Sequence, residues 1–207
     1  NFLKPKDIGT DSDRALLLDF QATLEIKPEK AIKLEKDALA QIENITADNA
    51  RLVSNLHANL GGLYRMNGHP DLAREHMEKS ISLLDQFNLL HINDSIPQIA
   101  NYAMFLTEQQ EPERGISELQ KLSGIIKEYH SDDCLDYAKV QETLGTIYLM
   151  TANLPQAKTH FKRAFKIYEK IWADEPEMIE AKYQEIQELY PQIGFCIGKN
   201  LSGLLTK

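Results

Sequence analysis

The sequence contains few cysteines and no long apolar segment, and both absences narrow the class of protein. Only two cysteines occur among its 207 residues, Cys134 and Cys196. They lie too far apart to form a paired metal motif or a disulfide framework. No run approaches the roughly 20 apolar residues that span a bilayer. We therefore expect a cytoplasmic protein with reduced thiols and no membrane insertion.

Positive charge is also scarce. The chain has 23 Lys and Arg residues against 31 Asp and Glu residues, which gives a net charge of −8. Such a surface repels phosphate backbones, so we expect no direct nucleic-acid partner. The remaining composition, 43% hydrophobic and 26% charged, is typical of a folded chain. The chain begins without Met, so we allow for additional domains in a full-length protein.

The prolines reveal an internal repeat. Pro28, Pro70 and Pro112 are separated by steps of 42, and Pro155 follows one residue beyond the next step. Proline is favoured at the first position of a helix, where its missing N–H is not needed. The spacing therefore predicts four equivalent helices, each beginning at a proline.

Other residue types keep the same period. One small-residue series and two large apolar series recur with it: Ala31, Ala73, Gly115, Ala157; Met77, Leu119, Phe161; Leu83, Ile125, Ile167. The motif Leu60-Gly61-x-x-Tyr64 also returns two periods later as Leu144-Gly145-x-x-Tyr148. A small residue in each unit predicts a place where two helices approach closely.

Within each unit, apolar residues recur at steps of three and four, which predicts amphipathic helices. The expected helix pairs are 12–26 with 28–43, 47–67 with 70–88, 95–110 with 112–129, and 134–152 with 155–172, followed by a capping helix at 177–190. The N-caps expected for the first helices of the pairs are Asp11 or Ser12, Thr46, Asn93 to Ser95, and Ser131 or Asp132. No segment predicts a strand. We divide the chain into a linker at 1–11, one array at 12–190, and a short helix or tail at 191–207.

These motifs resemble the tetratricopeptide repeat, whose usual period is shorter, at about 34 residues. The longer unit is similar to the 42-residue repeats of kinesin light chains and their bacterial relatives. The resemblance implies an all-α, right-handed superhelical solenoid of antiparallel helix pairs, with a concave groove that binds peptides or proteins. In the first unit, Asp19 stands where the resemblance leads us to expect a small residue.

The first helix of each unit lines the groove in this family. Stepping by 42 along the face opposite the packing face gives polar ladders flanked by methionines. The candidate ligand-binding residues are Asn55, Asn59, Arg65, Met66, Asn101, Met104, Lys139, Thr143 and Thr146. Asparagine amides both donate and accept, so they could bind the backbone of an extended peptide. Alternatively, these amides bond neighbouring helices and stabilise the superhelix.

Arg65 and Lys139 are the only groove cations that we place where a carboxylate clamp would need them, and two are too few. No catalytic constellation, metal-ligand cluster or cofactor motif is present in the sequence, so we expect a protein that is not an enzyme. The helix at 155–172 carries Lys158, Lys162, Lys166 and Lys170, which either dock an acidic partner or form a solvated face. The acidic helix at 177–190 has the corresponding two interpretations, a basic partner or a solvated face.

The sequence therefore predicts a non-enzymatic scaffold whose groove binds another protein or an extended peptide. An alternative function stays open, in which a short peptide shifts the superhelix of a regulator's sensor domain and so controls an attached effector.

Overall fold

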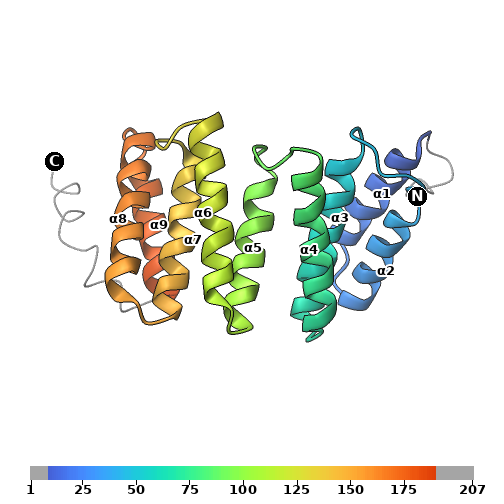
Figure 1. The fold of residues 1–207 in the computed structure, drawn as a ribbon, viewed down its shortest axis with the longest axis horizontal. Coiled ribbons are helices and arrows are strands. Elements are labelled where there is room, and N and C mark those ends of the chain that lie inside the picture. Colours follow the sequence, from blue (N-terminus) through green and yellow to red (C-terminus); the bar gives the residue numbers. More distant parts are fainter. Residues whose placement is uncertain (1–8, 190–207) are drawn as a thin grey trace. The chain divides into compact units, whose positions relative to one another are not determined.

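The computed structural model describes residues 9–189, and helices make up 77% of them. The helices are α1 (Asp11–Thr23), α2 (Pro28–Leu39), α3 (Ala50–Met66), α4 (Pro70–Gln86), α5 (Ser95–Glu108), α6 (Pro112–Tyr129), α7 (Leu135–Met150), α8 (Leu154–Ile171) and α9 (Pro176–Leu189) (Figure 1). No strand occurs in this described part of the chain, so the predicted all-α fold is confirmed. The predicted short helix or tail at 191–207 and most of the linker at 1–11 lie outside the described residues.

The prolines mark helix starts as predicted, because α2, α4 and α6 begin at proline and Pro155 is the second residue of α8. The largest boundary error concerns the connection between α2 and α3. We expected helix up to residue 43 and again from residue 47, whereas α2 ends at Leu39 and α3 begins at Ala50. Asn49 holds this connection in turns, because its side chain accepts from Thr46 N at 2.8 Å and donates to Asn44 O at 2.9 Å.

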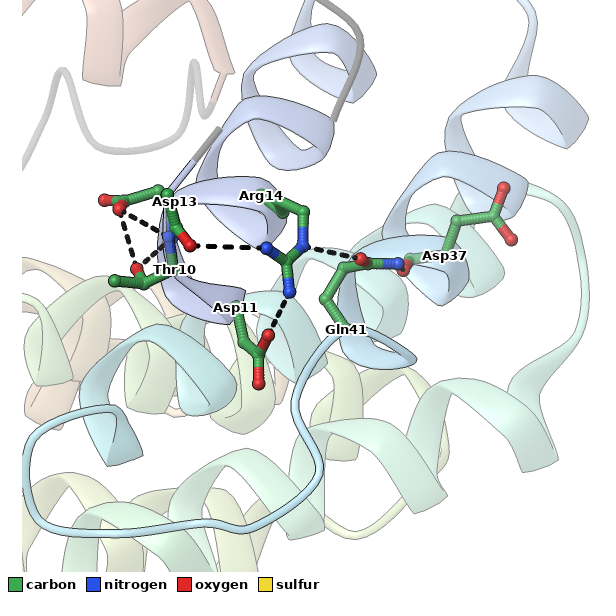
Figure 2. Close-up of polar contacts among 7 residues, drawn as sticks. Thr10, Asp11, Asp13, Arg14, Asp37 and Gln41 are labelled. Atoms are coloured by element: carbon green, nitrogen blue, oxygen red, sulfur yellow. Dashed lines mark hydrogen bonds and ion pairs between the residues drawn. The ribbon is translucent and has the colours of Figure 1, made fainter. Parts of the chain in front are cut away.

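Three predicted N-caps are wrong by one to three residues. Thr10 caps α1 in place of Asp11 or Ser12, and forms a reciprocal capping box with Asp13 (Figure 2). Asn49 occupies the cap position of α3 in place of Thr46. Cys134 caps α7 in place of Ser131 or Asp132, with its Sγ accepting from the Tyr137 N–H at 3.4 Å. A thiol is a weak acceptor, so the cysteine gave no cap signal in the sequence.

Arg14 ties the first helix pair together beside this Thr10 cap. Its Nε donates to Gln41 Oε1 at 3.3 Å, just beyond the end of α2, and its guanidinium also pairs with Asp11 (Figure 2). The first pair is thus joined by a polar contact at its edge as well as by its core.

The chain forms two compact units that divide between Phe105 and Leu106. In the N-terminal unit α1 packs on α2, α2 on α3 and α3 on α4. In the C-terminal unit α6 packs on α7, α7 on α8 and α8 on α9. Helix α9 buries Ile179 and Ile186, as expected for a helix that covers the end of a stack. One continuous array over residues 12–190 stays a prediction.

The small-residue series marks the close helix contacts. Ala73 and Ala157 are 0% and 1% exposed, as predicted. A Cβ placed on Gly61 would lie 2.5 Å from Met77 Cγ, and a Cβ on Gly145 would lie 2.9 Å from the Phe161 ring. Glycine therefore permits the observed crossing of α3 with α4 and of α7 with α8, which any larger residue would push apart.

The turns inside the helix pairs repeat with equal regularity. Gly68, Gln110 and Ala152 have positive φ angles of 74°, 66° and 58°, and they follow one another at the repeat period. At each turn the next N–H returns to a carbonyl five residues earlier, at 2.9 Å, 2.8 Å and 2.7 Å respectively. This is the Schellman arrangement, in which a left-handed residue ends a helix. The hairpin turn therefore keeps its geometry although only one of these three copies uses glycine.

Candidate functional site

A polar pocket of about 360 Å³ opens in the N-terminal unit between α1, α3 and the start of α5. We call it the α1–α3–α5 pocket. The residues that line it are Asp19, Thr23, Asn55, Ala58, Asn59, Asp94, Pro97, Gln98 and Asn101. These helices are the first members of successive pairs, which the sequence predicted to line the groove. Three of the candidate asparagines therefore face one cavity.

One wall of the pocket is fixed by a buried polar network. Gln98 is 8% exposed, and its Oε1 accepts from the hydroxyls of Ser54, at 2.8 Å, and Ser80. Its Nε2 donates to Asn55 Oδ1 at 2.6 Å. Since the side chains of Ser54 and Ser80 are buried, this network joins α3, α4 and α5 beneath the pocket. The wall is therefore formed before any ligand arrives.

On another wall, Asn59 bonds to two carboxyl groups, of which Asp19 lines the pocket and Glu35 lies behind the lining. Asn59 Nδ2 donates to Asp19 Oδ1 at 2.9 Å and to Glu35 Oε1 at 3.2 Å. Glu35 is only 1% exposed, and its Oε2 has no hydrogen-bond partner among the described residues. Burial, followed by the charge of Asp19, raises the pKa of Glu35 from 4.5 to about 8, although the Asn59 bond acts the other way. Glu35 therefore keeps its proton over much of the neutral range.

The position of these carboxyls in the repeat is unusual. Asp19 stands one period before Gly61, in the series that continues with Ala103 and Gly145. Glu35 stands in the series of Met77 and Phe161. The first pair thus places two acids where the second and fourth pairs place glycine against a large apolar side chain. That exchange costs burial energy, so packing does not explain it.

The lining is anionic. Asp19 and Asp94 contribute carboxylates, and no Lys or Arg is among the described residues that line the cavity. Arg51 lies beside Asp94, with Nε 3.4 Å from Oδ2, but its side chain is 65% exposed. Asn101 is exposed and its side chain forms no hydrogen bond within residues 9–189, so its amide is available to a ligand.

The candidate asparagines were predicted either to bind a peptide or to bond neighbouring helices, and the structure contains features of both roles. Asn55 and Asn59 bond neighbouring helices, as the structural alternative had it, although both also line the pocket. In the same unit Met66 is 79% exposed, while Arg65 and Met104 are half-buried and do not line this pocket. Binding by these residues stays a prediction.

The other three candidates lie in the C-terminal unit. The Thr143 hydroxyl donates to Lys139 O at 3.0 Å, and the Thr146 hydroxyl donates to Glu142 O at 3.1 Å. Lys139 Nζ lies 3.8 Å from Asp136 Oδ1. Both threonine hydroxyls therefore donate their proton to a carbonyl of their own helix, so they can only accept a hydrogen bond from a ligand.

Sequence reasoning missed Gln98, Asp94 and Glu35. Two of them carried a signal that the repeat period makes visible. Gln98 occupies the position of Leu56 and Val140, which are fully buried, and Glu35 occupies that of Met77. A polar residue in an otherwise apolar series therefore marked the pocket. Asp94 lies in a connecting loop, where no series exists to compare it with.

A histidine pair lies between α3 and α4. The Nδ1 atoms of His57 and His76 are 2.9 Å apart, and the His76 ring stacks on Tyr64 with centroids 5.4 Å apart. Burial, followed by the charges of His76 and Lys79, lowers the pKa of His57 to about 4. Burial also lowers the pKa of His76. One ring nitrogen must donate and the other accept, so the pair is compatible with neutral imidazoles and not with two imidazolium ions.

Within residues 9–189, no three His, Cys, Asp or Glu side chains are grouped so that they could hold a metal ion. The same part of the chain has no helix with the length and apolar content needed to cross a membrane.

The fold defines a class of protein, the helical-hairpin repeat proteins, in which antiparallel helix pairs follow one another along the chain. Residues 95–170 match the family model described as tetratricopeptide repeat. The match shows tetratricopeptide repeats in this segment, which runs from α5 to α8. A search of curated proteins found no match.

Solved structures of low sequence identity share this fold. BtubC (BKLC) from P. vanneervenii aligns with a TM-score of 0.64 at 20% identity, over 76% of this chain but only 62% of that one. The nearly identical TPR-like repeats of a putative kinesin light chain from Podosopora anserina give 0.69 at 13% identity, over 82% of each chain. MamA gives 0.53 at 15% identity, over 75% of this chain and 79% of its own. The similarity to kinesin-light-chain repeats, noted from the period of 42, is thus confirmed as a likeness of fold.

Proposed function

We propose that the chain is a non-enzymatic binding module of the cytoplasm, and that the α1–α3–α5 pocket receives a basic segment of another protein. The observation that carries the proposal is the acidic pair Asp19 and Glu35, at positions where other repeats pack glycine against an apolar side chain. Residues that lower stability without a packing role are typical of functional sites.

The chemistry of the pocket favours a cation. Asp19 and Asp94 line it without a lining Lys or Arg among the described residues, so a Lys or Arg side chain of the ligand would meet two carboxylates. Asn101 offers an exposed amide that both donates to and accepts from a peptide backbone. The networks around Gln98 and Asn59 hold the walls in place, which reduces the ordering that binding requires.

A bound cation would also act on Glu35, which lies behind the lining and bonds to Asn59 in the pocket wall. Its Oε2 has no partner in the described part of the chain. A positive charge nearby would favour the ionised form of this carboxyl, so binding should release a proton near neutral pH. Proton release upon binding would thus distinguish this pocket from a groove that binds only through amides.

The test uses selection from a library of random extended peptides, followed by fluorescence anisotropy with the selected sequences. We expect the selected peptides to be enriched in Lys and Arg. Asn101→Arg places a cation in the pocket and should weaken binding by at least about tenfold, equivalent to about 1.4 kcal/mol.

The matched control is Ser82→Arg, which adds the same charge at an exposed position of α4 that does not line the pocket. It should leave affinity unchanged within about twofold, which is below about 0.5 kcal/mol. Peptides without a basic bias, or equal binding by both variants, would contradict the proposal.

A further inference from the structure

A second and larger hollow, of about 660 Å³, lies in the C-terminal unit against α6, α7 and α8. We call it the basic hollow. Five cationic side chains line it: Lys127, Lys162, Arg163, Lys166 and Lys170. Among the described residues, the carboxylates of its lining are those of Asp132 and Asp133, on the loop before α7. The hollow is therefore positive on a protein whose net charge is −8.

Tyr137 forms a fixed centre for two of these cations. It is 2% exposed, and Lys127 Nζ lies 5.2 Å from the centre of its ring. Arg163 Nη1 donates to the Tyr137 hydroxyl at 3.5 Å. The ring thus holds cations from α6 and α8 toward the same space, instead of leaving them to extend freely into solvent.

Most of the cations have no anion of their own. Lys127, Lys162, Arg163 and Lys166 form no ion pair with any residue in the described range 9–189, whereas Lys170 pairs with Asp133. The Lys170 hydrogen bond and charge hold the pKa of Asp133 below its ordinary value. The Asp133 side chain is 56% exposed, so another carboxylate could replace it at Lys170 without entering the core.

We propose that the basic hollow is a docking site for an acidic segment of a partner protein. The cations on α8 extend from Lys162 to Lys170, a length of about 12 Å along a helix. An extended peptide covers that length with about four residues, so a run of Asp and Glu fits where a single small anion would meet only part of the row. The site lies outside the α1–α3–α5 pocket and does not rest on the function proposed for it.

The probe is a fluorescein-labelled peptide of alternating Glu and Gly, titrated with the full chain and followed by anisotropy at low and at physiological ionic strength. Lys166→Glu should weaken binding by about tenfold, because it reverses a charge in the middle of the row. Lys158→Glu is the matched control, since it makes the same change on an exposed face of α8 outside the lining. It should weaken binding by less than about twofold, through the change in net charge alone.

Asp133→Asn tests the site in the opposite direction. It removes the anion that occupies Lys170, so binding should tighten by about two- to threefold. Three results would overturn the proposal: equal weakening by Lys166→Glu and Lys158→Glu, equal binding of a peptide with Gln in place of Glu, or full displacement by millimolar inorganic phosphate. The first would reduce the hollow to a general electrostatic attraction, and the last would make it a site for single anions.

Discussion

Helices α3 and α4 of the N-terminal unit and helices α7 and α8 of the C-terminal unit are two versions of one hairpin, offset by two repeat periods. Both cross at a glycine, Gly61 against Met77 and Gly145 against Phe161. In both, a tyrosine ring stacks on a histidine ring. The ring centroids are 5.4 Å apart for Tyr64 and His76, and 5.2 Å apart for Tyr148 and His160. The shared contacts therefore define the crossing of the hairpin.

The two hairpins differ in what they bury. Ser54 and Ser80, which bond to Gln98, correspond to Ala138 and Ala164, which are fully buried and apolar. His57, which faces another histidine, corresponds to Gln141, whose Oε1 lies 2.9 Å from His160 Nδ1. The comparison shows that the same crossing accepts either a serine pair or an alanine pair, and either a His–His or a Gln–His contact.

The polar version is the one beside the α1–α3–α5 pocket. Its hydrogen bonds position Asn55 in the pocket wall, and the lowered pKa of His57 predicts a loss of stability in acid. Alanine would pack as well as Ser54 and Ser80, as Ala138 and Ala164 show at the same positions of the C-terminal hairpin. We infer that the N-terminal unit gives up stability to orient polar groups, which the following substitutions test.

The largest expected effect concerns the contacts that both hairpins share. Ala73→Leu and Ala157→Leu should each lower the free energy of unfolding by about 2–3 kcal/mol, because a larger side chain has no space between the helices. Chemical denaturation measures both, with Lys166→Ala as an exposed control that should change stability by less than about 0.5 kcal/mol. A large loss in only one hairpin would break the equivalence of the two.

Glu35→Gln should stabilise the protein above about pH 4.5, the ordinary pKa of the carboxyl group. The native pKa of about 8 exceeds the ordinary 4.5, so the native state binds the proton more tightly than the unfolded state. The resulting stability is complete below pH 4.5 and is lost as the pH rises through 8. The substitution removes this loss, so the free energy of unfolding at pH 6 should rise by about 2 kcal/mol.

Denaturation at pH 4.5 supplies the internal control for Glu35→Gln, since wild type and variant should then differ little. A variant that is equally stabilised at both pH values would show that the effect comes from shape and not from charge.

Asn59→Ala should cost about 1.5 kcal/mol, because it leaves Asp19 and Glu35 without their shared donor. Asn101→Ala is the matched control on α5, where an exposed amide without an internal partner in the described residues should be replaced at a cost below about 0.5 kcal/mol. Thermal unfolding compares the two. Equal costs would mean that Asn101 also belongs to the structural network.

His57→Gln gives the N-terminal hairpin the arrangement of the C-terminal one. The native pKa of His57 is lowered from 6.5 to about 4, so the unfolded state takes up the proton first as the pH falls. Stability is therefore present above pH 6.5 and is lost toward pH 4. Between pH 6.5 and 5.5 the variant should lose about 1 kcal/mol less than wild type.

Gln141→His is the reciprocal variant, and it should add a pH-dependent loss to the C-terminal hairpin. The two slopes, measured by denaturation over the same pH range, should move in opposite directions. If both variants leave the slope unchanged, the histidine pair does not control the acid sensitivity of the fold.

Much of the fold could be predicted because helix starts and close contacts depend on local chemistry. Pro70 and Ala73 act through backbone geometry and size, which a period of 42 exposes directly. The caps could not be placed as well, since Thr10, Asn49 and Cys134 compete with equally suitable neighbours and tertiary packing decides among them.

The candidate site was predictable in position more than in chemistry. Asn59 and Asn101 follow from the repeat, and both line the α1–α3–α5 pocket. The partners of Asn59 could not be predicted from the repeat. Asp19 of α1 and Glu35 of α2 reach the same amide only because of how these helices pack on α3. The lysines that α8 contributes to the basic hollow could be seen in the sequence as a stripe along one helix. The contributions of Lys127 from α6 and Tyr137 from α7 could not, because they depend on how the helices pack.

The Schellman turns at Gly68, Gln110 and Ala152 have a consequence for how such a chain can change in length. Three residues separate the helices at each of these turns, and the second helices begin in strict register with the repeat, at Pro70, Pro112 and Leu154. The connections between pairs differ, from ten residues before α3 to four before α9. Insertions and module exchange should therefore be tolerated between hairpins and not within them, so that a transplantable segment of this protein begins and ends in the variable connections.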